Sequence, residues 1–180
     1  MAVTLIPEDG TGITGANSYV SLADAITYST NWANTAFTGA ATDDIRTTAL
    51  FTAAYALDRL YGRRYISMQP PYSTQGLLWP RYTAMGNDYR LISANSIPQC
   101  LKDAQCELAN MSIAGVSLFP NQSTNRLMKE TSVTVGPIKT QNSYWSVPTD
   151  VEHYDGFRKV ELILAAVLLK ENNDGARISL

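Results

Sequence analysis

Apolar residues recur at helical spacing between Thr42 and Gly62, and this pattern predicts the clearest helix in the chain. Thr42 is suited to cap its start, and Asp43 and Asp44 fall in the first turn, where the positive end of the helix dipole favours acidic side chains. Gly62 is placed to end the helix. The positions expected to face the core are Ile45, Ala49, Ala53, Ala56, Leu57 and Leu60.

Two further helices are predicted from capping residues and apolar spacing. Ser21 and Asp24 form a capping box, which predicts a helix that runs to about Trp32. Ser96 is expected to cap a helix that begins at about Pro98, because proline is tolerated in a first turn, where its missing N–H would have had no partner. The inner face of that helix is expected to carry Leu101, Ala104, Leu108 and Met111.

The last predicted helix runs from Thr149, which forms a capping box with Glu152, to about Lys170. Its second half is apolar around nearly the whole circumference, and a helix of that kind must be covered on every side. We therefore expect a central core helix, with a core helix that also packs against another subunit as the alternative. The residues concerned are Leu162, Ile163, Leu164, Ala165, Ala166, Val167, Leu168 and Leu169.

The segments between these helices have other patterns. Prolines and glycines interrupt residues 65–95, so we expect an ordered loop there that is packed by its own aromatic side chains. Residues 130–135 and 138–145 flank Gly136 and Pro137, and Val133 and Val135 alternate with polar residues. This alternation around a turn predicts a β-hairpin.

A chain of 180 residues fits a single domain. The expected fold is mainly α, a small bundle of about four helices with an inserted β-hairpin and extended arms at both ends. Residues 1–17 form the N-terminal arm, 18–120 and 149–170 the helical body, 128–146 a projecting hairpin, and 171–180 a C-terminal tail. The N-terminal arm has several glycines and no apolar period, which predicts an extended or mobile segment.

Charged residues make up 17% of the chain, below the roughly 25% usual in soluble domains. A surface with few charges costs less to desolvate, which suits a subunit that its neighbours cover in an assembly. The formal net charge of −2 disfavours a domain that coats nucleic acid, because such domains are usually basic. We expect no signal peptide and no membrane span, since residues 1–15 lack Lys and Arg and the most apolar run is about half the roughly 20 residues required.

Residues with the chemistry for catalysis are scarce. His153 is the only histidine, and its place in the first turn of the last predicted helix favours a solvated residue over a general base. Cys100 and Cys106 lie too far apart on one helix to form a disulfide, and they lack zinc-ligand spacing. The helix dipole, rather than calcium or magnesium, explains the nearby acidic residues Asp150, Glu152 and Asp155. With no common catalytic motif present, we expect no enzyme, no metal and no other cofactor.

A basic stretch rich in aromatic residues covers residues 55–90, where five arginines against two aspartates give a local charge of +3. Aromatic rings beside arginines bind single-stranded nucleic acid by stacking and phosphate contact. The same residue types are preferred in protein interfaces, and they also pack loops. We favour loop packing first, a protein interface second and nucleic acid third, because the whole chain is acidic. The aromatic residues are Tyr55, Tyr61, Tyr65, Tyr72, Trp79, Tyr82 and Tyr89.

Five short segments follow one another in an order that is shared with a known family. They are ANSYVSLADA from Ala16, ALDRLYGRRY from Ala56, LLWPR from Leu77, IPQCLKDAQCELA from Ile97 and VGPIK from Val135. In this order, before a leucine-rich last helix, they resemble the head-to-tail connector subunits of tailed phages, which are also grouped as DnaT-like single-stranded DNA-binding phage proteins. The resemblance covers residues 17–169.

The resemblance implies a structural virion protein without catalytic residues. It implies an adaptor that is made in the bacterial cytoplasm and forms a ring of about twelve copies in the phage neck. Its partners would be the portal protein, tail or nozzle proteins and copies of itself, and the double-stranded genome would pass through the ring without specific binding. Single-stranded DNA binding is the alternative function. Candidate contact residues are Arg63, Arg64, Tyr65, Trp79, Arg81, Val133, Val135, Ile138, Tyr144, Trp145, Ile178 and Leu180, and the alternative would use the first five of these.

Overall fold

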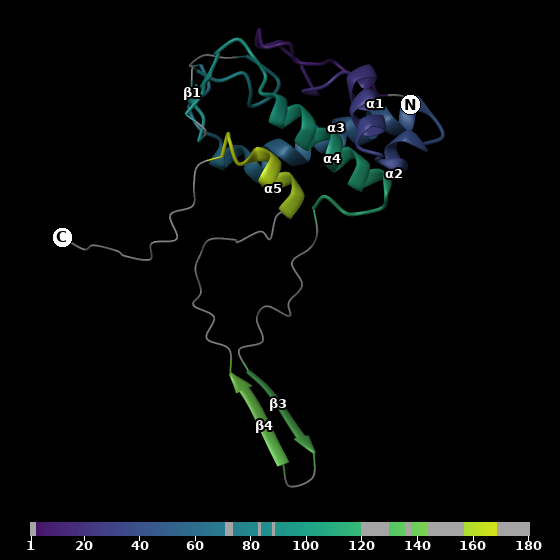
Figure 1. The fold of residues 1–180 in the computed structure, drawn as a ribbon, viewed down its shortest axis with the longest axis vertical. Helices are drawn as coiled ribbons and strands as arrows, with labels where there is room; N and C mark the ends of the chain where they lie inside the picture. The colour runs from purple at the N-terminus through teal and green to yellow at the C-terminus, as the bar shows by residue number, and fades with distance from the viewer. Residues whose placement is uncertain are drawn as a thin grey trace, which may run out of the picture. The chain divides into compact units, whose positions relative to one another are not determined.

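Two separate units make up the chain, a helical body formed by residues 1–118 and 155–180 and a β-hairpin unit formed by residues 119–154. The structure is a computed structural model, and it describes residues 3–70, 74–82, 84–87, 89–119, 130–135, 138–143 and 157–168. The chain is mainly helical and forms a small helical bundle with an inserted hairpin, as the sequence predicts (Figure 1). Within the described ranges, no helix combines the length and the hydrophobicity of a membrane span.

The central element of the helical body is α4, which contacts α1, α2, α3 and α5. Six consecutive residues of α4, from Ala104 to Ala109, are all buried. The prediction that the last helix of the chain is the central core helix is therefore wrong. The helices of the body are α1 (Leu22–Asn31), α2 (Thr35–Thr38), α3 (Asp43–Tyr61) with the short 3₁₀ helix η1 (Gly62–Arg64), α4 (Gln99–Ile113) and α5 (Arg158–Leu164).

Gln105 explains how a helix with polar residues lies at the centre of the body. Its side chain is fully buried and accepts a hydrogen bond from the Tyr19 N–H at 2.7 Å. It also donates to the Ser18 hydroxyl at 2.7 Å and to the Leu50 carbonyl at 2.9 Å. Because these bonds replace the ones it would make with water, burial of the amide is not strongly penalised. Gln105 therefore joins α4 to α3 and to the segment before α1.

The predicted starts of α1 and α3 are confirmed. Ser21 accepts a hydrogen bond from the Asp24 N–H, and Thr42 accepts one from the Ile45 N–H, so each hydroxyl satisfies an early helix amide. The start of α4 differs, because Pro98 is its N-cap and the Ser96 hydroxyl donates to the Ser93 carbonyl instead. The segment between α1 and α3 contains the single-turn helix α2.

The last helix is shorter than predicted. Among the described residues, α5 spans Arg158–Leu164, and its proposed capping residues Thr149 and Glu152 lie outside them. Val160 and Leu164 are buried, but Leu162 is 62% exposed, so α5 is not covered on every side within the body. After a turn, the chain pairs with residue Tyr65 through an isolated bridge at Leu168.

The described part of the segment before α1, residues 3–17, contains no helix, as expected of an arm, and it lies against the body. The Glu8 carboxylate is buried and accepts three backbone hydrogen bonds at 2.8–3.0 Å, from Gly10, Gly12 and Ile13. A Cβ at Gly76 would overlap the backbone of Ala16, so a glycine there allows the 74–78 loop to lie directly on the segment.

Two antiparallel hairpins are present among the described residues. The pair β1 (Ala84–Met85) and β2 (Leu91–Ile92) falls in the segment predicted to be a loop. The predicted hairpin is confirmed as β3 (Glu130–Val135) and β4 (Ile138–Ser143), with pairing from Val135↔Ile138 to Glu130↔Ser143. The expected end of its second strand, at residues 144 and 145, lies outside the described residues.

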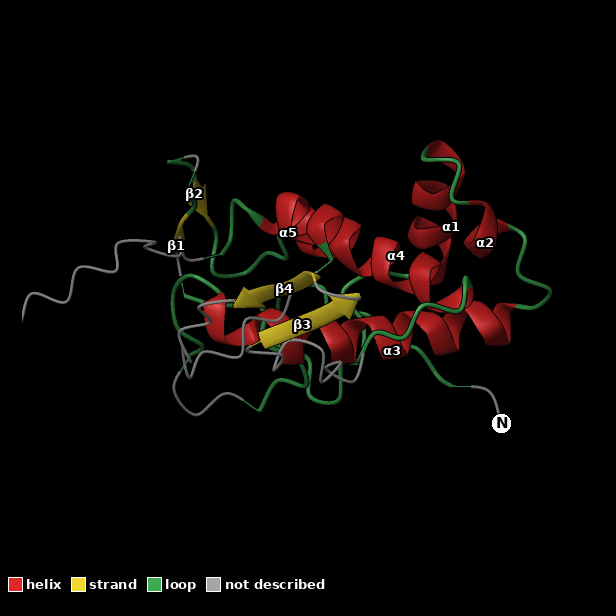
Figure 2. Ribbon diagram, turned by 90° about the horizontal axis from the view of Figure 1, so that it is seen from below, coloured by secondary structure: helices red, strands yellow, loops and turns green. Residues whose placement is uncertain are grey.

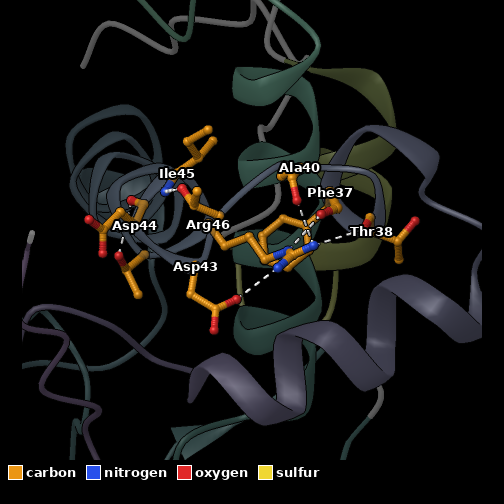
Figure 3. A network of polar contacts seen from close by, with 9 residues as sticks. Phe37, Thr38, Ala40, Asp43, Asp44, Ile45 and Arg46 are labelled. Carbon is orange, nitrogen blue, oxygen red and sulfur yellow. Dashed lines mark hydrogen bonds and ion pairs between the residues drawn. The ribbon is translucent and has the colours of Figure 1, made fainter.

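Within the helical body, β1 and β2 lie at one end and α1 and α2 at the other, and α3 runs between the two ends (Figure 2). The start of α3 is joined to α2 by Arg46, whose guanidinium donates hydrogen bonds to three carbonyl oxygens (Figure 3). These carbonyls belong to Phe37, Thr38 and Ala40, at 3.0, 2.8 and 2.8 Å.

Candidate functional site

The two aromatic residues at the centre of the basic stretch lie inside the helical body. Tyr65 is 3% exposed and Trp79 is fully buried, and their rings meet edge to face with centroids 6.1 Å apart. The Tyr65 hydroxyl donates to the Leu57 carbonyl at 3.4 Å. The rings therefore pack the loop, which was the first interpretation of this stretch. Their placement differs from the surface role that the resemblance implied, because neither ring reaches a partner from inside the core.

The three arginines proposed as contact residues have different surroundings. Arg64 forms an ion pair with Glu161 of α5 at 3.2 Å. Arg81 donates to the Ser67 carbonyl at 2.7 Å and lies 5.9 Å from the centre of the Tyr65 ring, and burial lowers its pKa. Arg63 is exposed. Arg64 and Arg81 thus stabilise the loop against the body, whereas Arg63 is accessible to a partner.

Of the remaining candidate contacts, Val133, Val135 and Ile138 lie near the turn of the β3–β4 hairpin. Val135 pairs with Ile138, and Val133 pairs with Thr140. Several residues singled out in the sequence lie outside the described residues, namely Tyr72, Tyr144, Trp145, Asp150, Glu152, His153, Asp155, Ile178 and Leu180.

The cysteines and acidic residues of the described part of the chain form no candidate metal centre. No group of three or more His, Cys, Asp or Glu side chains is placed there to hold an ion. Cys100 and Cys106 are not joined by a disulfide. Burial raises the pKa of the Cys106 thiol to about 12, which keeps it protonated near neutral pH and therefore poorly nucleophilic.

Large apolar side chains are exposed at both ends of the helical body. At the β1–β2 end, Tyr89 is 81% exposed, Leu91 76% and Met85 61%. Tyr89 has a backbone φ of +61°, a left-handed conformation that a bulky residue rarely adopts. At the opposite end, Trp32 follows α1 and is 63% exposed. Exposed aromatic and apolar side chains of this kind are typical of protein contact surfaces.

A groove runs beside the outer face of α3. It has a volume of about 300 Å³ and is bordered on the α3 side by Phe51, Tyr55 and Arg59. The loop residues Leu77 and Leu78 form part of the opposite wall. Tyr55 and Arg59 belong to the basic stretch of residues 55–90, whereas Phe51 lies outside it. The sequence signal that could have identified this wall of the groove is the spacing of four residues from Phe51 to Tyr55 and from Tyr55 to Arg59. This spacing places all three residues on one face of a helix.

Asp58 also lines this groove and joins three segments of the body. Its carboxylate accepts a hydrogen bond from the Tyr19 hydroxyl at 2.6 Å and another from the Leu78 N–H at 2.9 Å. Burial raises the pKa of Asp58 to about 6, although these two hydrogen bonds act in the opposite direction. The Tyr19 hydroxyl in turn accepts a hydrogen bond from the backbone N–H of Trp79 at 3.3 Å.

Another buried carboxylate, Glu107 of α4, has no counterpart in the sequence predictions. It is 1% exposed and forms an ion pair of 2.6 Å with Lys159, at the start of α5. It also accepts hydrogen bonds from the Tyr28 hydroxyl at 3.0 Å and the Asn34 amide at 3.3 Å. Glu107 therefore joins α4 to α5, α1 and the start of α2.

Comparison with known proteins gives one family. The sequence model of the family described as "Putative DnaT-like ssDNA binding protein" matches residues 3–180, nearly the whole chain. No curated protein and no solved structure matches the chain.

Proposed function

This chain belongs to the DnaT-like ssDNA binding protein family, and we propose that it is a structural adaptor in a phage particle, through which the DNA genome passes. In this proposal, copies of the chain form a ring in the neck that joins the portal to the tail and lets the genome pass. Its partners are the portal protein, tail or nozzle proteins and other copies of itself. It carries out no catalysis.

The observation that carries this proposal is the exposed apolar surface at the two ends of the helical body. A subunit in a closed ring contacts its neighbours through two different faces, because head-to-tail contacts close by rotation. Trp32 at one end and Tyr89 with Leu91 at the other are each more than 60% exposed. Burial of these side chains against neighbouring copies would stabilise a ring, whereas their exposure in a lone subunit is unfavourable.

The β3–β4 hairpin gives further support. Among the described strands, β3 and β4 pair only with each other, so the outer edge of each strand keeps unused backbone hydrogen-bonding groups. Such edges can accept a strand from another protein. The acidic net charge also fits a ring whose lumen has to release DNA rather than hold it.

Negative-stain electron microscopy tests the proposal, using this protein mixed with the portal protein of the same phage and the protein alone as a control. We expect an added ring of density beneath the portal. Deletion of residues 128–146 or 171–180 should abolish the ring while the helical body stays folded. Portal binding that survives both deletions would contradict the proposal.

A matched pair of substitutions tests the role of the ends. Trp32→Ser should prevent ring formation, because it removes the large apolar side chain at the α1 end of the body. Leu162→Ser is the control, since Leu162 is 62% exposed, nearly the same as Trp32, but belongs to α5 rather than to the α1 end of the body. Equal effects of the two substitutions would show that the ends have no special part in assembly.

Single-stranded DNA binding is a second candidate function, and the family's description favours it. It cannot use Tyr65 and Trp79 as stacking surfaces, because both rings are buried. The test is the fluorescence anisotropy of a labelled oligonucleotide at low salt, where binding should fall steeply as salt rises. If Arg63 and Arg64 contact phosphates, as the resemblance implies, replacing both by alanine should weaken binding. No change in anisotropy at micromolar protein would exclude this function.

A further inference from the structure

The outer face of α3 carries aromatic rings at positions where a surface helix usually carries polar side chains. Phe51 is 41% exposed and Tyr55 is 51% exposed. Arg59 follows four residues later, and its guanidinium carbon lies 5.1 Å from the centre of the Tyr55 ring. Each step of four residues advances about 6 Å along the helix axis, so the three side chains form a line. We call these three residues the α3 line.

The α3 line borders the groove of about 300 Å³, which is at the small end of the range for small-molecule sites. Leu77 and Leu78 add apolar surface on the other side. A groove of this size and composition has room for a flat ring between apolar side chains, with a guanidinium beside it. It fits a ligand that combines aromatic rings with negative charge.

The charges around the groove favour the same kind of ligand. Arg59 is exposed, and Arg63, also exposed, follows it in η1. The nearby carboxylate of Asp58 is largely buried, and its two oxygens already accept hydrogen bonds from Tyr19 and Leu78. The accessible charge at this end of the α3 line is therefore positive, even though the whole chain is acidic.

We infer that the α3 line is the surface on which this protein holds a single DNA strand, with bases stacked on Phe51 and Tyr55 and a phosphate beside Arg59. The inference rests on the second candidate function. The advance of about 6 Å along the helix axis from Phe51 to Tyr55 is nearly twice the 3.4 Å rise per nucleotide in one strand of a duplex, so each ring takes one base of an unstacked strand. Double-stranded DNA binds poorly here, because its base faces are covered by their neighbours.

The test is the anisotropy of a short, labelled oligothymidylate at low salt, with the wild type and the double variant Phe51→Leu with Tyr55→Leu. Leucine keeps apolar surface at both positions but removes the ring faces, and both positions are exposed, so the fold should persist. Loss of two stacking contacts should weaken binding by roughly 100-fold. Tyr89→Leu is the matched control, because Tyr89 is an exposed tyrosine at the β1–β2 end of the body, outside the α3 line. This substitution should change the affinity by less than about twofold.

Two further measurements separate stacking from general attraction. Arg59→Ala should reduce the slope of log affinity against log salt by about 0.7, the value for one phosphate contact on a single strand. A labelled duplex of the same length should bind at least about tenfold more weakly than the single strand.

The outcomes distinguish this inference from the functions proposed above. If the wild type binds the oligonucleotide and the double variant binds equally well, or no more weakly than Tyr89→Leu, the α3 line is not the site and the second function stands. If the wild type does not bind, the α3-line inference and the single-stranded DNA-binding function are both overturned. The adaptor proposal is tested separately, by microscopy. If the double variant, folded by circular dichroism, keeps DNA binding but loses the ring on the portal, the α3 line is a protein contact and the inference fails.

Discussion

At the scale of single residues, buried polar side chains decide how the helical body closes. Gln105, Glu107 and Asp58 each lie where an apolar residue would be the simpler choice, and each is hydrogen-bonded to segments distant in sequence. A buried polar group is costly unless it has partners, so each of the three fixes which segments can pack together. Burial raises the pKa of Asp58, which makes its contribution measurable.

Asp58 should make the stability of the protein depend on pH. Its folded pKa of about 6 lies above its ordinary value of 3.8, so protonation stabilises the folded state. This contribution is complete below pH 3.8 and is lost as pH rises through about 6. The total is roughly 3 kcal/mol, since each pKa unit corresponds to 1.36 kcal/mol.

Urea unfolding of the wild type and Asp58→Asn between pH 4 and pH 8 measures this contribution. Asparagine resembles the protonated acid, so the variant should gain stability relative to the wild type as pH rises. Asp44→Asn is the control, because Asp44 is exposed at the start of α3. A stability difference between Asp58→Asn and the wild type that stays constant with pH would show that Asp58 titrates at its ordinary pKa.

The ion pair between Glu107 and Lys159 gives a second prediction. Lys159→Met should destabilise the fold by about 1–2 kcal/mol, because it leaves the buried carboxylate without its cation, and the half-exposed position of Lys159 reduces the effect. Adding Glu107→Gln should recover part of that loss, since the remaining group is then neutral. Chemical unfolding of both single variants and the double variant checks this, and strictly additive effects would mean that the pair is not coupled.

At the scale of elements, the junction between α2 and α3 depends on one side chain from outside α2. A helix of four residues has too few internal hydrogen bonds to form alone. Arg46 of α3 supplies donors to the carbonyls of Phe37, Thr38 and Ala40 and also forms an ion pair of 2.7 Å with Asp43 (Figure 3). The short helix is therefore held by a neighbouring element rather than by its own sequence.

Arg46→Ala should lower the free energy of unfolding by about 2–3 kcal/mol, since several carbonyls near the surface lose a charged donor. Arg46→Lys should recover little, because an ammonium cannot reach three carbonyls in the planar arrangement of a guanidinium. Thermal unfolding measures both variants. Arg63→Ala, at an exposed position, is the control and should stay within about 0.5 kcal/mol of the wild type. An Arg46→Ala variant as stable as this control would refute the role of Arg46.

At the scale of the whole molecule, the chain divides into a body and a hairpin unit with separate sets of contacts. The body closes through contacts of α4 with four other helices, all of which belong to it. A two-stranded hairpin has little stability of its own, so β3 and β4 gain most from a partner. This division is consistent with the proposed role of the hairpin in assembly.

Replacing residues 128–146 with a short glycine and serine linker should leave the body folded. The unfolding midpoint should change by less than about 3 °C, because the hairpin belongs to a separate compact unit of the chain. Differential scanning calorimetry of the wild type and the variant measures the change. A large fall in the midpoint, or loss of cooperative unfolding, would show that the hairpin is part of the same folding unit.

The local elements followed from the sequence because their signals are local. Ser21, Thr42 and the apolar spacing of α3 determine helix starts and the buried face within a few residues, and the alternation around Gly136 and Pro137 determines the β3–β4 hairpin. Hydrogen bonds between neighbouring residues need no knowledge of the rest of the chain. The same holds for the mainly helical class of the fold.

Only the tertiary structure decided which helix lies at the centre and which aromatic rings reach solvent. The apolar run in the last helix predicted that this helix is central, but α4 is, because the burial of a helix depends on how many neighbours surround it. Partners distant in sequence allow the polar residues Gln105 and Glu107 to be buried in α4. Tyr65 and Tyr55 belong to the same basic stretch, yet one is in the core and the other lines a groove. Sequence determined the elements through local forces, and the choice between core and surface came from contacts that form only when the chain is folded.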